Sequence, residues 1–510
     1  MFSSILSAAI LGMEVCPVQV EADVSDGLPS FTIVGFASSQ VKEAQERVRT
    51  ALKNMEIALP PKRITINLSP VGIRKEGAGF DLPVAAAILC ALRLVPASSL
   101  SQVMVMGEVS LSGAIRHVPG VLPVVIRARE LGCHTCIIPK DNEQEASLVK
   151  DIRIVAVQTI KELIRFCTAP EKYESIQTAG SQKTPGLQRK YEVDFADIQG
   201  QESVKRAAEI AVSGFHNLLL IGPPGSGKTM TARRIPTILP ELTFEESLEL
   251  TKIYSIAGLL SKEEPILLSR PFRAPHHTSS AQALAGGGRN PKPGEVTLAH
   301  RSVLFLDEMP EFSKRALEIL RQPLEDRRIQ LSRVQGTYTF PANFLLVGAM
   351  NPCPCGYYPD MNRCTCSPGS VQQYLQRISQ PLLDRIDVCA ESPELGYDQI
   401  IGSREEESSA QIRSRVEKVH LIQKKRFQGT SCQFNSEIPP SRVRQFCSLD
   451  EEGEQILKKA YESLHLSGRG YHRILKVSRT IADMEGCERI GAAHVREALG
   501  YRTPDKKYWK

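Results

Sequence analysis

The pattern of apolar and polar positions divides the chain into segments of different character. Residues 1–168 alternate short runs rich in valine and isoleucine, such as 64–68 and 103–106, with stretches of helical periodicity, such as 40–55 and 82–92. Short apolar runs bounded by turn residues are typical of strands, and strands that alternate with helices indicate a mixed fold. We therefore predict an α/β domain over residues 1–168.

A polar stretch separates this domain from the rest of the chain. Residues 169–192 contain Glu, Ser, Gln, Gly and Pro but hardly any apolar side chains, so they cannot bury enough surface to fold alone, and we predict a linker there. Strand-like and helical runs alternate again over 193–403, whereas 404–510 shows helical periodicity without strand-like runs. The predicted order is α/β domain, linker, α/β core and C-terminal helical domain.

The start of the chain predicts a strand rather than a membrane anchor. Residues 1–13 are apolar, but they are interrupted by serines and lead into Val15, Val18 and Val20, which we interpret as the first strand. No segment approaches the roughly 18 apolar residues that a membrane span needs. The start also lacks the basic region and cleavage site of a secretion signal, and the 13 cysteines are unevenly spaced. A reducing, cytoplasmic location is therefore predicted.

Size and charge narrow the function only slightly. With 510 residues, of which 42% are apolar, the chain is long enough for several domains that each bury a core. The net charge of +6 comes from 63 basic and 57 acidic residues spread over the whole chain. This excess permits nucleic-acid binding without requiring it.

The strongest chemical signal is a glycine-rich loop between a strand and a helix. The apolar run 217–221 leads directly into the pattern G-x-x-x-x-G-K-[ST], which comprises Gly222, Pro223, Pro224, Gly225, Ser226, Gly227, Lys228 and Thr229. Glycines let the backbone wrap closely enough for its N–H groups to point at phosphates, and the following helix adds positive potential at its N-terminus. Lys228 is expected to reach the β- and γ-phosphates of ATP, and Thr229 the Mg²⁺.

A second strand ends in two carboxylates. The apolar run 303–306 is followed directly by Asp307 and Glu308. Because this second motif accompanies the glycine-rich loop, a glycine turn that merely resembles a phosphate-binding loop becomes a poor explanation of residues 222–229. Asp307 suits Mg²⁺ binding and Glu308 suits polarising the attacking water, which are the two acidic roles in phosphoryl transfer to water. ATP hydrolysis is therefore expected, and not binding alone.

Two further polar residues suit the same chemistry. The apolar run 344–347 leads to Asn351, which is placed to orient the water beside the γ-phosphate, although an Asn before proline is also an ordinary turn residue. Arg385 stands in an otherwise apolar stretch. An arginine supplied across a subunit boundary can stabilise transition-state charge, and the alternative for Arg385 is a salt bridge with Asp384 or Asp387.

With these motifs the chain resembles the ComM/YifB family of bacterial magnesium-chelatase-like AAA+ proteins over nearly its entire length. The resemblance implies that the two strand acids are the Walker B residues and that Asn351 is sensor 1. It also implies that Arg385 is an arginine finger acting in trans and that Arg473 is sensor 2. Parts of this kind imply a homo-hexamer.

The resemblance implies two elements that face the ring pore. Residues 327–340, with a turn at 335–336, correspond to the hairpin before sensor 1, and Arg333 falls near its tip. The segment with His276 and His277 looks like the insert of the same relatives, with a flexible surface loop as the alternative. Six copies of Arg333 around a DNA backbone would give binding that is largely independent of sequence and sensitive to salt.

The N-terminal domain is similar to the Lon protease domain in segments 74–87 and 107–116. Lon-type proteolysis needs a serine nucleophile and a lysine base, but the alignment places Gly79 and Leu122 at those positions, and neither side chain can act in that way. The resemblance implies a non-proteolytic domain used for subunit assembly or for contacting DNA as it leaves the ring.

Taken together, these features predict an α/β multidomain protein. Its parts are a Lon-like (S5-type) α/β domain over 1–168, a P-loop AAA+ core with a parallel sheet between helices over 193–403, and a helical lid over 404–510.

Four cysteines follow Asn351 closely in two C-x-C pairs, and these are Cys353, Cys355, Cys364 and Cys366. Four thiolates can complete a tetrahedral Zn²⁺ site, but the C-x-C spacing is tighter than usual, so free structural thiols remain the alternative. Disulfides are disfavoured in cytosol. Cys133 and Cys136 lie between a helix and an apolar strand and are interpreted as packing residues.

Three functions remain open. The leading hypothesis is an ATP-driven hexameric motor on single-stranded or branched DNA, a helicase or branch-migration factor that assists recombination during natural transformation. Its cofactors are ATP and Mg²⁺, with Zn²⁺ as a further candidate. The alternatives are the motor subunit of a magnesium chelatase and a protein-remodelling ATPase. The Lon-like domain argues against the chelatase, because the resemblance implies that chelatase motors begin at the ATPase core.

Overall fold

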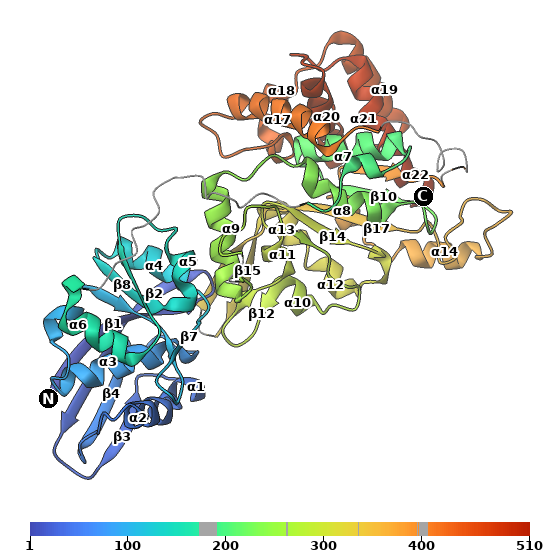
Figure 1. Cartoon of the computed structure of the whole chain (residues 1–510). Helices are drawn as coiled ribbons and strands as arrows, with labels where there is room; N and C mark the ends of the chain where they lie inside the picture. Colours follow the sequence, from blue (N-terminus) through green and yellow to red (C-terminus); the bar gives the residue numbers. More distant parts are fainter. Residues whose placement is uncertain (173–190, 262–263, 335, 395, 397–405, 510) are drawn as a thin grey trace.

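The chain forms an N-terminal α/β domain, a central domain with a parallel sheet and a C-terminal helical domain (Figure 1). The computed structural model describes residues 1–172, 191–261, 264–334, 336–394, 396 and 406–509. Most of the predicted linker 169–192 lies outside this part of the chain. Among the described residues, no helix has the length and apolar character needed to cross a bilayer.

The N-terminal domain is built on a seven-stranded mixed sheet in the order β3-β4-β2-β1-β5-β8-β9. Its strands are β1 (Phe2–Leu11), β2 (Glu14–Ser25), β3 (Ser30–Val34), β4 (Arg63–Ser69), β5 (Val103–Val105), β8 (Thr135–Pro139) and β9 (Arg153–Val157), with a separate small pair β6 (Glu108–Val109) and β7 (Ile115–Arg116). Its helices are α1 (Ser39–Lys42), α2 (Ala44–Asn54), α3 (Asp81–Ala91), α4 (Val121–Glu130), α5 (Glu143–Ala146) and α6 (Ile160–Thr168).

The first strand lies earlier than the sequence predicted. The apolar opening is itself β1, which pairs antiparallel along its whole length with β2, the strand that carries Val15, Val18 and Val20. Serines interrupted the apolar pattern, but Ser3 is buried and its hydroxyl donates to the carbonyl of Ala87 at 2.7 Å. A buried hydroxyl with a partner is tolerated inside a strand, so the serines do not end it.

The central domain has a five-stranded sheet in the order β11-β14-β17-β10-β18, and every pairing in it is parallel. The strands are β11 (Phe272–Arg273), β14 (Val303–Leu306), β17 (Leu345–Met350), β10 (Leu218–Ile221) and β18 (Val388–Glu391). Leu218 and Leu220 pack into a different hydrophobic cluster from Leu219 and Ile221. Both faces are therefore covered, which is why these strands are uninterrupted apolar runs.

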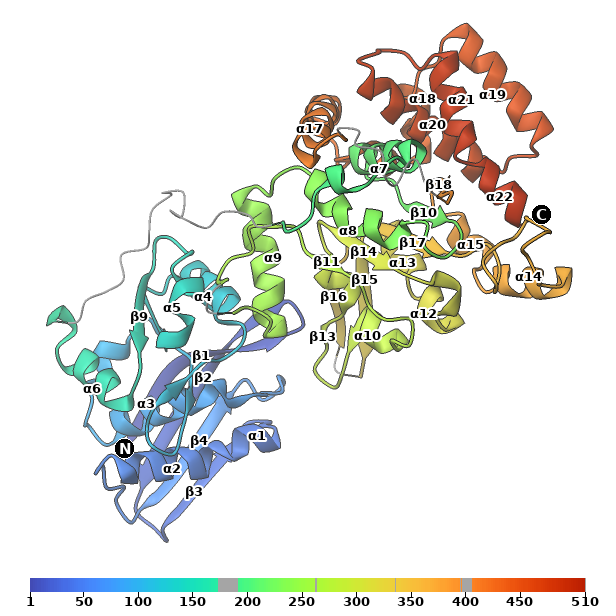
Figure 2. The same ribbon diagram turned by 45° about the vertical axis from the view of Figure 1, so that its right-hand side comes forward.

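Helices and two hairpins complete the central domain. The helices are α7 (Glu202–Gly214), α8 (Lys228–Ile238), α9 (Phe244–Ala257), α10 (Ala281–Ala285), α11 (Glu295–Leu298), α12 (Lys314–Glu318), α13 (Arg321–Asp326), α14 (Pro368–Leu375) and α15 (Gln380–Leu383). One hairpin joins β12 (Gly286–Gly287) to β13 (Lys292–Pro293), and the other joins β15 (Arg328–Arg333) to β16 (Gly336–Pro341). Both extend away from the helical lid (Figure 2). Because Gly336 pairs with Arg333, Gly336 belongs to the second strand and not to the predicted turn at 335–336.

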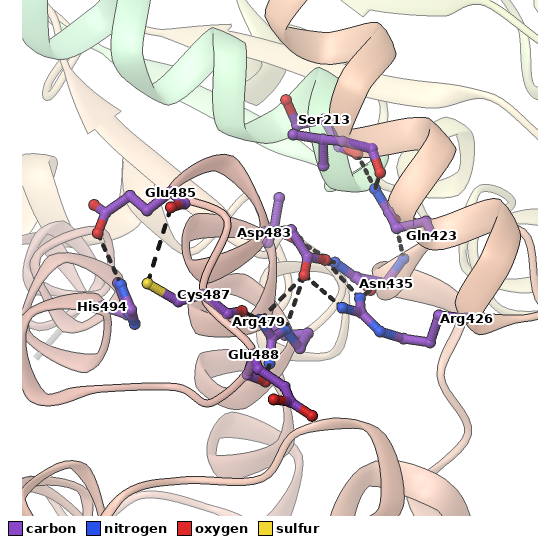
Figure 3. Close-up of polar contacts among 12 residues, drawn as sticks. Ser213, Gln423, Arg426, Asn435, Arg479, Asp483, Glu485, Cys487, Glu488 and His494 are labelled. Carbon is purple, nitrogen blue, oxygen red and sulfur yellow. Dashed lines mark hydrogen bonds and ion pairs between the residues drawn. The ribbon is translucent and has the colours of Figure 1, made fainter.

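The C-terminal domain is helical, as predicted, with α17 (Ser409–Arg426), α18 (Val443–Phe446), α19 (Glu451–Ser463), α20 (Gly468–Met484), α21 (Ala492–Gly500) and α22 (Thr503–Tyr508). A buried polar network holds it together around the Asp483 carboxylate, which accepts bonds from Arg426, Arg479 and Asn435 (Figure 3). The chain end then returns to the core, where the Trp509 indole donates to the carbonyl of Leu375 at 3.0 Å.

Helix α9 of the central domain contacts the N-terminal domain, and both views place it between the two domains (Figures 1 and 2). The amide of Gly120 donates to the carbonyl of Ser255 at 2.9 Å, and the Ser255 hydroxyl donates to Glu145 at 2.8 Å. Burial raises the pKa of the Glu145 carboxyl, and bonds from Asn142 and Ser255 oppose this shift. Leu248 of α9 also packs against a hydrophobic cluster of the N-terminal domain. The N-terminal domain is therefore held to the central domain through polar as well as apolar contacts.

Candidate nucleotide-binding site

The glycine-rich loop takes the conformation that phosphate binding requires. It follows β10 and ends where α8 begins at Lys228. Gly225 and Gly227 have φ angles of +79° and +82° with open space around them, a backbone conformation that side-chain-bearing residues rarely adopt. At Gly222 a Cβ would come within 2.2 Å of the carbonyl oxygen of Ser392. The loop therefore points its backbone N–H groups and the start of α8 toward one space, an arrangement suited to an anion.

Lys228 is held at the centre of this loop. Its Nζ donates to the carbonyls of Gly222 and Pro223 at 2.8 Å each, and to the Asn351 side-chain oxygen at 3.3 Å. Burial lowers the pKa of Lys228 to about 8, opposed by the attraction of Asp307. The structure therefore brings the predicted sensor residue Asn351 to the P-loop, because β17 and β10 are parallel neighbours that end at the same edge.

Asp307 and Thr229, the two residues predicted to bind Mg²⁺, lie side by side. The Thr229 hydroxyl donates to Asp307 Oδ2 at 2.8 Å, and Asp307 Oδ1 accepts the amide of Glu308 at 3.0 Å. A hydroxyl and a carboxylate beside a phosphate-binding loop are hard oxygen ligands of the type that Mg²⁺ takes in nucleotide sites. The residues present therefore fit Mg²⁺ together with ATP.

Glu308 faces solvent at the same edge. Its side chain is 58% exposed, and its Oε2 lies 3.3 Å from His277 Nδ1. Its backbone has φ 49° and ψ 45°, the left-handed region that is uncommon for a residue with a side chain. The sequence analysis predicted that Glu308 polarises the attacking water, and the structure leaves its carboxylate exposed directly after β14.

Arg385 and Arg473 are not brought to this edge. The carbonyl of Arg385 accepts from Asn217, which precedes β10, whereas the P-loop follows β10. Arg473 donates to the carbonyl of Ile386 at 3.0 Å in the same region. With about 3.3 Å of rise per strand residue, the two edges are separated by the length of the strand, on the order of 13 Å. Both arginines thus lie at the amino edge of the sheet, away from the P-loop of their own chain.

The partners of these two arginines differ. Arg385 pairs with Glu325 and donates to the carbonyl of Pro381 at 2.6 Å, so neither predicted salt bridge, to Asp384 or to Asp387, is the one formed. Arg473 instead pairs with Asp384 at 3.0 Å.

The two hairpins carry a cluster of exposed cations. Arg333 lies at the end of β15 and donates to the carbonyl of Gly288 in the neighbouring hairpin at 3.3 Å. Arg289 and Lys292, which the sequence did not single out, are exposed beside it. Val334 follows at the fully exposed tip. Two hairpins that are distant in sequence therefore present three positive charges together.

Comparison with known proteins agrees with all three parts of the chain. A family model described as magnesium chelatase, subunit ChlI, matches residues 194–400, one described as subunit ChlI of Mg-chelatase matches residues 20–142, and one for the ChlI C-terminal part matches residues 406–502. The competence protein ComM of Haemophilus influenzae is 44% identical over 503 residues, which cover 98% of this chain and 97% of that protein. The chain belongs to the ComM/YifB family.

Other relatives support this assignment and the fold. The protein YifB of Escherichia coli is 41% identical over 507 residues, covering 99% of this chain and 97% of that protein. Lon protease 2 of Bacillus subtilis is 32% identical over 127 residues, which are 25% of this chain and 22% of that protein. The AAA+ core, the Lon-like similarity and the helical C-terminal domain that the sequence predicted are thereby confirmed.

The Lon-like domain of this ComM/YifB protein has apolar residues around its two substituted positions. A Cβ at Gly79 would lie 3.1 Å from the Met106 side chain, and Leu122 is fully buried in the same hydrophobic cluster as Met106. Neither position offers a nucleophile or a base. Cys133 and Cys136 are buried in this cluster too, and burial raises their pKa values, as expected of packing residues.

The four cysteines after Asn351 come together in the central domain. Their Sγ atoms all lie within 4.8 Å of one another, with 3.8 Å between Cys353 and Cys364 and 3.6 Å between Cys355 and Cys364. All 13 cysteines of the chain are free thiols. The amides of Gly356 and Tyr358 donate to the Cys353 sulfur at 3.2 and 3.3 Å.

This cysteine loop packs on the P-loop. Gly356 has φ +89°, and a Cβ there would lie 2.4 Å from Pro224 Cδ. Only glycine can lie this close to the proline ring. The backbone of the loop after Asn351 therefore packs directly against the ring of Pro224 in the P-loop. No local pattern indicated this contact, because positions 224 and 356 are 132 residues apart in the chain.

A second cluster of metal-binding side chains lies in the lid, formed by Glu485, Cys487 and His494 (Figure 3). His494 Nδ1 accepts the amide of Gly491 at 2.8 Å, and Nε2 faces Glu485 at 2.9 Å. In a neutral ring that accepts at Nδ1, the proton sits on Nε2, which leaves no lone pair there for a metal. The cluster is therefore interpreted as a cap of α21.

One residue near the nucleotide site was missed by the sequence analysis. The Gln201 amide donates to the carbonyls of Ser226 at 3.1 Å and Pro393 at 2.8 Å, and so ties the start of α7 to the P-loop. A lone Gln before a helix carries no motif, so sequence alone offered no signal for it.

Proposed function

We propose that this chain is the subunit of an ATP-hydrolysing hexameric AAA+ motor on DNA, a helicase or branch-migration factor in recombination during natural transformation. The observation that carries the proposal is the division of the catalytic groups between two edges of one sheet. Lys228, Asp307 and Asn351 meet at the carboxyl edge, whereas Arg385 lies at the amino edge. A ring in which one subunit's amino edge faces the next subunit's P-loop would complete each site, and such head-to-tail contacts close into rings.

ATP and Mg²⁺ are the cofactors of this proposal. The P-loop from Gly222 to Thr229 would hold the phosphates, with Thr229 and Asp307 as magnesium ligands. Mg²⁺ supplies charge neutralisation on the phosphates when bound. The exposed Glu308 carboxylate accepts a proton from the attacking water, Asn351 orients that water, and Arg385 and Arg473 from the neighbouring subunit act on the developing charge.

DNA is the proposed substrate because of the hairpin cations. Arg289, Lys292 and Arg333 are exposed at the tips of two adjacent hairpins. In a ring of six subunits they would give six equivalent groups of positive charge, which suit a phosphate backbone and bind with little dependence on sequence. ComM, a relative named as a competence protein, is 44% identical over nearly the whole chain, which supports a role in DNA uptake and recombination.

Two alternatives are retained, the motor subunit of a magnesium chelatase and a protein-remodelling ATPase. A model described as subunit ChlI of Mg-chelatase matches residues 20–142. We had expected an N-terminal domain of this kind to be foreign to chelatase motors, but this match makes it compatible with a chelatase subunit. The full-length similarity to ComM and the exposed cations favour DNA.

The function is tested by steady-state ATP hydrolysis of the purified protein with single-stranded, duplex and four-way-junction DNA, alongside its mass in solution. Stimulation by DNA together with a hexameric mass supports the DNA motor. An ATPase that no DNA stimulates would favour one of the two alternatives. A monomeric mass under every condition, with full activity, would contradict the shared site.

We also propose that the four cysteines hold Zn²⁺. A tetrahedral zinc site with Zn–S bonds near 2.3 Å separates its sulfurs by about 3.8 Å. The separations of 3.6 and 3.8 Å from Cys364 fit that value, and Cys353 and Cys355 lie closer together, at 3.3 Å. Backbone amides that donate to the Cys353 sulfur stabilise a thiolate ligand. The metal would fix the loop that connects Asn351 to the contact with Pro224.

Metal analysis of the purified protein tests this site directly. One equivalent of zinc per chain is expected, lost in Cys364→Ser and kept in the control Cys487→Ser, which changes an exposed lid cysteine. Zinc retained in Cys364→Ser, or absent from the native protein prepared under reducing conditions without chelators, contradicts the assignment.

A further inference from the structure

The hairpin formed by β15 and β16 is a separate two-stranded sheet. A two-stranded hairpin is marginally stable by itself in water, so its apolar face needs a cover. Ile329 lies opposite Phe340 on that face, and Leu331 lies opposite Tyr338. The first three of these side chains are buried. Arg333 follows two residues after Leu331 on the same strand, so whatever covers the apolar face also fixes the strand that carries Arg333.

Part of this cover comes from the N-terminal domain, through the turn that joins β1 to β2. Met13 packs against the cluster under the hairpin that contains Phe340, and also against a cluster that contains Ile253 of α9. Gly12 beside it has φ +63°, and a Cβ there would lie 3.1 Å from Tyr338 Cδ1. The turn therefore lies between α9 and the hairpin, where both views show the ends of β1 and β2 (Figures 1 and 2).

The same end of the β1–β2 ribbon reaches the second hairpin. The side-chain amide of Asn290, in the loop between β12 and β13, donates to the carbonyl of Ile10 at 3.3 Å. Asn290 follows Arg289 directly and precedes Lys292 by two residues. One turn of the N-terminal domain and its flanking residues thus contact both of the hairpins that carry the exposed cations.

The position of this turn is fixed by its own domain. β1 pairs with β2 along its whole length, up to Leu11 opposite Glu14. A Cβ at Gly120 would lie 2.0 Å from Ile10 Cδ1, so the ribbon packs closely on the start of α4. The amide of Gly120 in turn donates to the carbonyl of Ser255 in α9 at 2.9 Å. The turn is therefore held by contacts that do not involve either hairpin.

We propose that Met13 is a positioning residue for DNA binding, through which the Lon-like domain supports the hairpin that carries Arg333. The inference rests on the proposed DNA motor, and it gives the N-terminal domain a role in that motor that needs neither proteolysis nor a DNA contact of its own. A supported hairpin loses little conformational freedom when it binds a phosphate backbone. A loose hairpin has to be ordered on binding, which lowers the affinity.

The test compares Met13→Ser with two control variants of the full-length protein. Met13→Leu keeps an apolar side chain of similar volume, and Leu28→Ser changes a side chain of the same domain that is 89% exposed. The measurements are amide hydrogen exchange of β15 and β16 and affinity for single-stranded DNA over a range of salt concentrations. For Met13→Ser we expect faster exchange in the hairpin and about tenfold weaker DNA binding, the effect of ordering one or two side chains on binding.

The salt dependence separates positioning from direct contact. In Met13→Ser the salt slope should keep its native value, because no phosphate contact is lost. The mass in solution and the DNA-free ATP hydrolysis should also be unchanged. Met13→Leu and Leu28→Ser should behave as the native protein in every measurement.

Three results would overturn the proposal. The first is hairpin exchange in Met13→Ser that equals that of the native protein. The second is faster exchange without any loss of DNA affinity. The third is a Leu28→Ser variant with the same changes as Met13→Ser. If the native protein binds no DNA, the DNA motor fails and with it the DNA role of Met13, whereas faster exchange in Met13→Ser would still show that Met13 holds the hairpin.

Discussion

In the proposed ring, each site combines the P-loop of one subunit with Arg385 of the next. A mixture of two variants, each defective in one of these parts, tests that arrangement. Lys228→Ala removes the ammonium that contacts the P-loop carbonyls and Asn351, and it should abolish ATP binding. Arg385→Ala leaves the P-loop intact and should lower kcat by about 10³-fold or more, the usual value of an arginine that acts on transition-state charge. Each variant alone is then nearly inactive, for different reasons.

Co-assembly of the two variants should restore activity. A site works when its P-loop comes from an Arg385→Ala subunit and its arginine from a Lys228→Ala neighbour. With equal amounts and random order, both conditions hold at about one quarter of the sites in a head-to-tail ring. ATP turnover near a quarter of the native value per site is therefore expected from the co-expressed mixture.

The refuting result follows from the same arithmetic. If Arg385 acted in its own chain, no mixed ring would contain a complete site, and the mixture would be no more active than the separate variants. Arg496→Ala, which changes an exposed lid arginine, serves as a control for loss of a surface charge and should retain native turnover. A mixture without activity, measured on rings of confirmed mass, would contradict the shared site.

Three further predictions concern single groups. Glu308→Gln should stop turnover while ATP remains bound, because the amide cannot take a proton; normal turnover would remove Glu308 from the mechanism. Burial lowers the pKa of Lys228 to about 8, so above that pH the free protein has lost the charge that phosphates favour. ATP affinity should therefore fall as pH rises through this value, with proton uptake on binding that calorimetry in buffers of different ionisation heat can measure; affinity independent of pH there would argue against it. Arg333→Ala should weaken DNA binding for all sequences and reduce the salt slope of single-strand binding by about 0.7 per lost phosphate contact, with DNA-free ATPase unchanged; an unaltered slope would exclude Arg333 from the DNA contact.

The sequence by itself determined the chemistry at the carboxyl edge of the central sheet. Buried parallel strands must be continuous apolar runs, and the polar residues that follow them must meet at one edge. The P-loop after β10, the acids after β14 and Asn351 after β17 could therefore be located from local spacing, and Lys228, Asp307 and Asn351 lie together as this argument requires. The strands, the hairpin around Arg333 and the helical lid were predictable for the same reason.

Tertiary structure alone decided the relations between distant segments. No spacing rule revealed that Arg385 and Arg473 share the opposite edge, that Gly356 touches Pro224, or that His277 meets Glu308. The opening strand was also misjudged, because a buried serine such as Ser3 is satisfied by a carbonyl 84 positions away in the chain. Local patterns record which face of an element is buried. The partner on that face is chosen by strand order and packing, and it is these that place Arg385 at the edge of the sheet opposite the P-loop.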